Sequence, residues 1–254
     1  MREFRRLKLR SCQQSHIQEW FSSQLGESLA AQESACLEQH ISAMFGYHVV
    51  QIGHMIQDED LLQVSPARNR VVMGIAPGGK SVDLQAEACR LPFAGDSVDG
   101  VLLPHTLDFS SDPHQVLREV ERVLIPEGKL LITGFNPWSL WGGVRMFRLR
   151  SSTPPWCGHF FSSRRVLDWL SLLGFELLDI HFLNYTPPIQ RPAIMQRLQF
   201  LEQFGENVYP NFGGVYIISA VKRVVTLTRI RPKWSVKKRV LPTAAEPTIR
   251  NGNY

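Results

Sequence analysis

The stretch Leu91–Phe135 constrains the fold more than any other part of the chain. It opens with a turn and the mainly apolar run 98–103, and it ends with the mainly apolar run 129–135. Between them, Asp112 and Pro113 mark the start of a helix, and apolar residues then recur at i, i+3 and i+4. Two buried strands around an amphipathic helix predict one βαβ step of a parallel sheet. The loop after its first strand should lie at the carboxyl edge of the sheet, where such folds bind ligands.

The same alternation continues on both sides of this stretch. Residues 16–45 predict two amphipathic helices, with a break near Gly26 or within 31–34. Seven segments have the composition of strands, namely residues 47–53, 69–76, 81–88, 98–103, 129–135, 175–183 and 215–224. Because the first five alternate with helical segments, we predict a doubly wound α/β fold.

Positive charge is concentrated at the two ends of the chain. The net charge is +5, yet residues 1–10 carry five Lys or Arg against one Glu, and residues 222–254 carry nine against one Glu. We therefore expect a basic arm at 1–14, one domain at 15–225 and a disordered basic tail at 226–254. Such a tail can contact nucleic acid or another anionic surface, or it can be merely solvated.

The four cysteines form no C-x-x-C pair and have no His at zinc-finger spacing. We therefore expect reduced cysteines, no metal site and a cytoplasmic location. No apolar run has the length of a signal peptide or of a transmembrane segment, so no membrane span is expected.

Several motifs of the central stretch resemble one family. LPF before an acidic turn, VDGVLL, DPHQVLREVERVL, and PEG before a strand together resemble the second half of class I S-adenosylmethionine-dependent methyltransferases, in particular their type 11-like branch. The resemblance implies a Rossmann-like sandwich with a mostly parallel seven-stranded sheet, in the order 3-2-1-4-5-7-6, and an antiparallel edge strand. It also implies S-adenosyl-L-methionine as cofactor and methyl transfer to a small-molecule acceptor.

The first strand departs from the family pattern. Family members end it with an acidic residue and a glycine loop of the type E/D-x-G-x-G-x-G, and here the stretch is VVQIGHM, in which only Gly53 matches. Backbone amides can still approach a cofactor there, so we predict Gly53 as a cofactor contact. The worn loop also favours an alternative, a catalytically inactive methyltransferase-fold adaptor whose basic ends contact nucleic acid or another anionic partner.

The resemblance also implies the other cofactor contacts. Glu87 stands four positions before LPF, where a carboxylate accepts a hydrogen bond from the adenine amino group. Leu103, Pro104 and Thr106 follow the fourth strand and are expected beside the cofactor. His105 is a candidate general base, because imidazole titrates near neutral pH; a packing role is the alternative.

Asn136, Trp138 and Trp141 follow the fifth strand and are expected to cap the substrate. The alternative is an amphipathic helix that covers an apolar edge of the sheet, and packing is the commoner use of such aromatics.

The segment Gly74–Ser81 fits the nucleotide-binding pattern G-x-x-x-x-G-K-[ST]. A P-loop needs a helix directly after its Lys-Ser, whereas the residues that follow here alternate like a strand. We therefore interpret the match as a turn between strands and keep an NTPase as the minor alternative.

Overall fold

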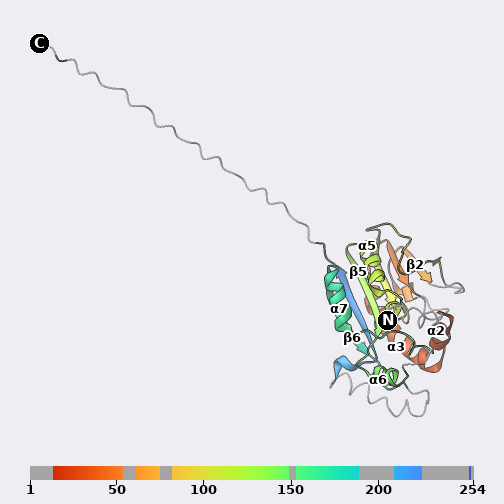
Figure 1. The fold of residues 1–254 in the computed structure, drawn as a ribbon. Helices are drawn as coiled ribbons and strands as arrows, with labels where there is room; N and C mark the ends of the chain where they lie inside the picture. The colour runs from red at the N-terminus through yellow and green to blue at the C-terminus, as the bar shows by residue number, and fades with distance from the viewer. Residues whose placement is uncertain are drawn as a thin grey trace. The chain divides into compact units, whose positions relative to one another are not determined.

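The computed structural model describes residues 14–53, 61–74, 82–148, 153–188, 209–224 and 252. The chain divides into two units, Met1–Val224 and Val225–Tyr254, and all the helices and strands described below belong to the first (Figure 1). The predicted basic arm, apart from Gln14, and the predicted tail, apart from Gly252, lie outside the described residues.

A seven-stranded sheet forms the centre of the first unit. Its order is β3-β2-β1-β4-β5-β7-β6, as the resemblance implied. The pairs from β3 to β5 are parallel, and β7 runs antiparallel to both β5 and β6. The strands are β1 (His48–Ile52), β2 (Asn69–Gly74), β3 (Leu84–Gln85), β4 (Val98–Pro104), β5 (Leu124–Phe135), β6 (Phe175–Leu183) and β7 (Val215–Lys222). The predicted doubly wound, mostly parallel α/β fold is thereby confirmed.

Helices cover both faces of this sheet. They are α2 (Gln14–Phe21), α3 (Gln24–Ser42), α4 (Thr106–Phe109), α5 (Pro113–Val123), α6 (Leu140–Phe147) and α7 (Ser163–Leu172), with the 3-10 turns η1 (Leu61–Val64) and η2 (Pro210–Phe212). The predicted start of α5 is confirmed, because Asp112 Oδ1 accepts a hydrogen bond from the Gln115 amide at 3.1 Å and Pro113 occupies the first turn.

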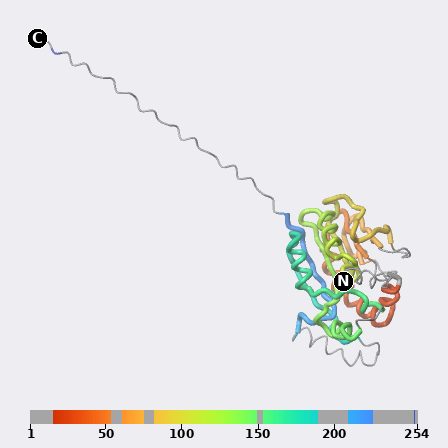
Figure 2. The backbone as a smooth tube through the Cα atoms, viewed as in Figure 1, coloured from red at the N-terminus to blue at the C-terminus, as the bar shows by residue number. Residues whose placement is uncertain are grey.

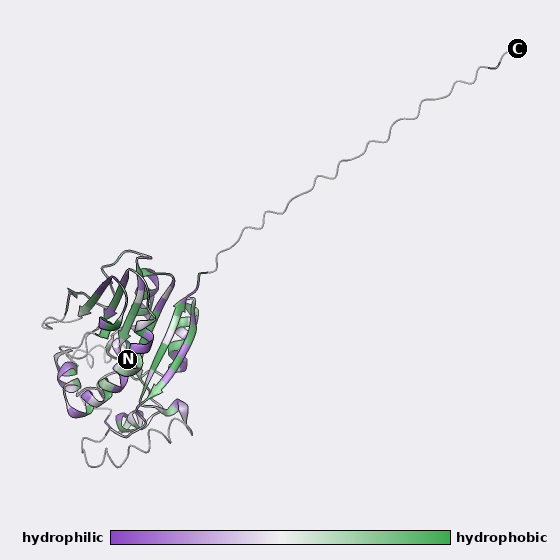
Figure 3. Cartoon of the chain, turned by 180° about the vertical axis from the view of Figure 1, so that it is seen from behind, coloured by the Kyte–Doolittle hydropathy of each residue, from purple (hydrophilic) through white to green (hydrophobic). Residues whose placement is uncertain are grey.

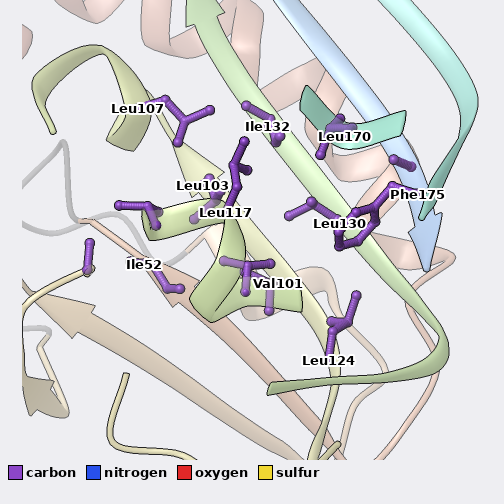
Figure 4. Packing of buried hydrophobic residues seen from close by; sticks show 14 of the residues in the cluster. Ile52, Val101, Leu103, Leu107, Leu117, Leu124, Leu130, Ile132, Leu170 and Phe175 are labelled. Atoms are coloured by element: carbon purple, nitrogen blue, oxygen red, sulfur yellow. The ribbon is translucent and has the colours of Figure 1, made fainter. Parts of the chain in front are cut away.

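The alternation of side chains along the strands divides the core between the two faces. Val101 and Leu103 of β4 pack with α5 and α7 in the cluster that Figure 4 shows, whereas Leu102 packs with α3 on the opposite face. Strands covered on both faces read as continuous apolar runs, and Figure 3 shows them mainly green between helices of mixed colour. This double burial explains why the strand positions were predictable.

A third apolar cluster joins the N-terminal helices to the segment after β5. Phe21 and Leu25 share it with Phe135 and Trp141. The red N-terminal helices and the green α6 accordingly lie near one another in Figure 2. The carboxyl end of β5 is therefore covered by elements that are distant in sequence.

Several local predictions were wrong. The break between α2 and α3 lies at Ser22 and Ser23, because the Ser23 hydroxyl caps α3 by accepting from the Gly26 amide at 3.3 Å. Gly26 instead allows the backbone of α3 to pack closely against the end of α2, since a Cβ there would lie 2.4 Å from the Trp20 carbonyl oxygen. The predicted third strand at 81–88 shrinks to Leu84–Gln85, and β5 begins at Leu124, so the PEG motif lies within this strand and not before it.

The cysteines also differ from expectation. Cys36 and Cys89 are free thiols, but Cys157 is disulfide-bonded. The prediction of reduced cysteines is wrong at Cys157, because C-x-x-C spacing tests only pairs that are close in sequence. Within the described ranges, no helix combines the length and apolar character needed to cross a membrane.

Most of the P-loop match, residues 75–81, lies outside the described residues. Val82 and Asp83, however, lead directly into β3, which pairs in parallel with β2. A P-loop requires a helix at this place, so the NTPase alternative fails.

Candidate functional site at the carboxyl ends of strands β1 and β4

The strand order reverses between β1 and β4, which are neighbours in the sheet although β2 and β3 intervene in sequence. Open α/β sheets bind ligands at such a switch point, beyond the carboxyl ends of the strands. Gly53 follows β1 there, and Pro104 and Thr106 stand at the end of β4. Three of the predicted cofactor contacts are therefore brought together.

The turn after β1 requires glycine at position 53. Its φ is +96°, and a Cβ would lie 2.8 Å from Thr106 Oγ1. The Gly53 amide donates to the Met73 carbonyl at 2.9 Å, and the Thr106 hydroxyl donates to the Ile52 carbonyl. The end of β1 is thus held between β2 and the start of α4.

Gln51 occupies the position where the family carries an acidic residue. It is 1% exposed, and its Nε2 donates to the Gly53 carbonyl at 3.0 Å. Its Oε1 has no hydrogen-bond partner among the described residues. A buried acceptor without a partner costs about 1–3 kcal/mol, so this oxygen is a candidate contact for a bound donor group. Sequence reasoning treated the position only as a lost acid.

Glu87 lies at the same edge of the sheet, two residues after β3. Its side chain is exposed, and no basic group among the described residues forms an ion pair with it. The Glu87 carbonyl accepts from the Arg90 amide at 2.9 Å, which fixes the turn. The carboxylate is therefore accessible to a ligand at the carboxyl edge.

His105 stands between β4 and α4 and is completely buried. Its φ of 49° is left-handed, which is uncommon for a residue with a Cβ. Its Nδ1 lies 3.0 Å from Asp108 Oδ2, and its Nε2 lies 2.9 Å from Glu33 Oε1 of α3. Because ionised carboxylates only accept hydrogen bonds, both ring nitrogens carry a proton when Glu33 and Asp108 are ionised.

Charge in this network favours the imidazolium form. Burial alone would lower the pKa of His105, but the charge of Glu33 and the hydrogen bonds to Asp108 and Glu33 outweigh it and raise that pKa to about 9. Burial raises the pKa of Asp108, and its hydrogen bond to His105 opposes the rise. A general-base role for His105 stays a prediction, and the geometry favours a residue that positions the loop.

Asp108 has a second oxygen that the network does not use. Its Oδ2 also accepts from the Phe135 amide at 2.9 Å, whereas its Oδ1 has no hydrogen-bond partner among the described residues. The same holds for the hydroxyl of Tyr216 on β7, whose pKa burial and the charge of Asp108 raise well above 10. Burial lowers the pKa of Arg145, and Asp108 opposes that change. A buried polar region thus extends from β4 toward β7 and α6.

The predicted cap residues lie in three different environments. The buried Asn136 donates to the carbonyls of Asn211 and Gly213 at 2.9 and 3.0 Å, so it fixes η2 and its C-terminal end. Trp141 is fully buried, and its Nε1 donates to the Thr186 carbonyl at 3.0 Å. Trp138 is 70% exposed. The packing alternative therefore describes Trp141, and Trp138 is the aromatic side chain that a ligand can reach.

Glu33 was missed entirely at the sequence level. A signal was present, because Glu33 lies between Leu29 and Leu37 at four-residue spacing, on the stripe that α3 buries. An acidic residue on an apolar stripe needs a buried partner. The identity of that partner, His105, depends on the fold.

Comparisons with known proteins concern the family and the fold. A family model described as a methyltransferase domain matches residues 62–132. The uncharacterized protein YafS of Escherichia coli K12 is 33% identical over 202 residues, which is 80% of this chain and 79% of YafS.

Solved structures share the fold at low identity. A SAM-dependent methyltransferase from Archaeoglobus fulgidus is 18% identical with a TM-score of 0.54, and the match covers 74% of this chain and 92% of that one. The [4+2]-cyclase SpnF is 17% identical with a TM-score of 0.52, over 75% of this chain and 80% of its own. The fold therefore occurs in proteins named for different reactions.

Proposed function

Because the chain belongs to the class I S-adenosylmethionine-dependent methyltransferases, we propose that it transfers the methyl group of S-adenosylmethionine to a small-molecule acceptor. S-adenosylmethionine supplies an electrophilic methyl group on a sulfonium. The observation that carries the proposal is the turn at Gly53, where a positive φ and the contact with Thr106 leave room for glycine alone. We assign this activity to the domain at residues 15–225.

The residues at the carboxyl edge suit the cofactor. The Gly53 turn holds the end of β1 against Thr106, and the unpartnered Gln51 Oε1 offers a buried acceptor to an ammonium or hydroxyl group. The exposed carboxylate of Glu87 accepts from an exocyclic amine such as that of adenine. The neutral Gln51 in place of an acid retains the acceptor oxygen and loses only the charge.

Residues 103–106 align the methyl donor with the acceptor. Leu103 and Pro104 are buried at the end of β4, and Thr106 ties that end to β1. Methyl transfer from a sulfonium depends on holding donor and acceptor in line and on excluding water. His105, held by Asp108 and Glu33, fixes the loop in its left-handed turn. The exposed Trp138, whose amide donates to Asn136, supplies an aromatic face toward the acceptor.

Titration calorimetry of the full chain with S-adenosylmethionine tests the cofactor assignment. We expect Glu87→Ala to weaken binding roughly 10-fold or more, since hydrogen bonds to charged groups contribute about 1.5–3 kcal/mol. Glu38→Ala, an exposed carboxylate on α3, is the control and should bind like the wild type. Wild-type affinity in Glu87→Ala would show that the carboxylate does not contact the adenine.

The glycine turn is tested in the same way. Gly53→Ala should lose at least 10-fold in affinity, whereas Gly143→Ala on α6, where a Cβ meets nothing within 4 Å, should not. Production of S-adenosylhomocysteine from fractionated metabolite extracts then identifies the acceptor. A folded wild-type protein that binds no cofactor at millimolar concentration refutes the proposal.

The incomplete glycine motif after β1 supports a second candidate function, that of a non-catalytic adaptor. Only Gly53 of the family's loop pattern remains, and Gln51 replaces the acid. This candidate predicts salt-dependent nucleic-acid binding without cofactor affinity, because phosphate contacts release counterions. Deletion of 226–254 should abolish such binding. Nucleic-acid affinity that is unchanged in the deletion variant excludes the tail as the contact surface.

A further inference from the structure

A second polar cluster lies away from the switch point, between α3 and the edge strand β6. It consists of His40 on α3 and of Asp179 and His181 on β6, and one ligand atom from each lies within 4.8 Å of the others. Residues two apart on a strand point to the same face, so both β6 side chains meet the helix that covers that face. The cluster plays no part in the proposed methyl transfer.

The three ligand atoms converge on one carboxylate oxygen. Asp179 Oδ2 lies 2.8 Å from His181 Nε2 and 3.9 Å from His40 Nε2, and the two imidazole rings meet edge to face with centroids 5.1 Å apart. Metal–nitrogen bonds of 2.0–2.1 Å in a tetrahedral site place ligand atoms about 3.3 Å apart. The observed distances bracket this value, so small side-chain rotations suffice.

The tautomer of His40 is already set for coordination. His40 Nδ1 lies 3.1 Å from the Cys36 carbonyl, which can only accept, so Nδ1 carries the proton of the neutral ring. The lone pair is then on Nε2, the nitrogen that faces Asp179. A hydrogen bond from the other ring nitrogen to a backbone carbonyl is the usual support of a metal-bound histidine.

An ordinary ion pair explains the cluster less completely. Asp179 and His181 are half exposed, and an exposed pair of this kind contributes little to stability. An ion pair between Asp179 and His181 also does not explain the position of His40, which comes from α3 and whose side chain is only 15% exposed. The partial exposure of the other two residues gives an ion access to the cluster.

We propose that His40, Asp179 and His181 bind a divalent transition-metal ion, with Zn²⁺ the best fit, and that the ion ties α3 to β6. Two imidazoles and one carboxylate match the ligands that Zn²⁺ prefers and leave a fourth position for water. In the neutral ring of His181, the proton that Nε2 shares with Asp179 moves to Nδ1 when the metal takes Nε2. Binding to the folded chain stabilises that chain.

The test uses the full, tag-free chain, freed of metal by a chelator and titrated with ZnCl₂ by calorimetry. We expect His40→Ala and His181→Ala each to lose one equivalent of Zn²⁺, or at least 10-fold in its affinity. The exposed His48 on β1 provides the control, since His48→Ala should keep that equivalent. The difference in Zn²⁺ binding between these variants and the wild type reports this site separately from any other Zn²⁺ site on the chain.

One further measurement keeps the proposal open to refutation. Zn²⁺ should raise the melting temperature of the wild type but not of Asp179→Asn. Stoichiometry, affinity and melting shift that are all unchanged in the three variants would overturn the proposal. Circular dichroism of each variant verifies that a loss of binding is not a loss of fold.

Discussion

Replacement of Glu33 by Gln probes the buried network that joins α3 to the loop after β4. The substitution keeps the size of the side chain and one acceptor oxygen, and it removes the charge 2.9 Å from His105 Nε2. The pKa of His105, about 9, lies well above its ordinary value of 6.5, and this difference corresponds to about 3 kcal/mol in favour of the charged form. The charge of Glu33 is the largest cause that raises this pKa. We therefore expect Glu33→Gln to lower the free energy of unfolding by about 2 kcal/mol at pH 6.5.

The sign of the pH dependence follows from the raised pKa. Above pH 6.5 the unfolded chain releases the proton of His105, while the folded chain retains it up to about pH 9. The stabilisation by the imidazolium is therefore complete below pH 6.5 and is lost as the pH rises through 9. The difference in unfolding free energy between wild type and Glu33→Gln should shrink over this range.

Urea unfolding followed by tryptophan fluorescence measures this difference at pH 6.5, 8 and 9.5. Taking the difference between two proteins cancels the titration of groups they share. Glu38→Gln, an exposed carboxylate on the same helix, controls for charge at a distance. A gap between wild type and Glu33→Gln that is absent at pH 6.5, or that stays constant to pH 9.5, would refute the assignment of an imidazolium held by Glu33.

Two further predictions use the same unfolding assay at pH 7. Trp141→Phe keeps an aromatic side chain but removes the Nε1 donor to Asn184 Oδ1 and the Thr186 carbonyl, so we expect a loss of about 1–2 kcal/mol. Trp138→Phe, at an exposed position, should leave the free energy of unfolding unchanged. Lys222 is buried, and its Nζ lies 2.9 Å from Asp96 Oδ1. Lys222→Met should lower the free energy of unfolding by about 2 kcal/mol. A loss below about 0.5 kcal/mol would show that this ion pair contributes no more than a surface contact.

The architecture was predictable because its signals are local. The parallel strands are covered on both faces and therefore read as short apolar runs, and Asp112 with Pro113 marks the start of α5. The strand order came from motifs of the family, such as LPF and PEG, and not from periodicity. The short helix α4 was missed, because four residues are too few for a periodic pattern to stand out, and α6 was anticipated only as the packing alternative for the segment after β5.

The interactions within the site were predictable only in part. Sequence places Gly53 and Thr106 at the ends of two strands, and the sheet order brings them together. Nothing in the sequence pairs Glu33 with His105, which are 72 residues apart, and the same is true of the contact between His40 and Asp179. Contacts between side chains on elements distant in sequence depend on the packing of α3 against the sheet, which composition does not encode.

The cost of burying charge indicates what the Glu33–His105–Asp108 network is for. Taking an imidazolium and two carboxylates out of water costs several kcal/mol per ion, which their mutual attraction repays only in part, so an apolar trio could serve stability equally well. The network does what apolar side chains cannot, since it holds His105 in a left-handed turn and ties Asp108 Oδ2 to the Phe135 amide. That turn sets the path of the backbone between Pro104 and Thr106, and hence the contact with Gly53. Stability and cofactor affinity should therefore fall together in Glu33→Gln, whereas lost stability with unchanged affinity for S-adenosylmethionine would reduce the network to a core contact.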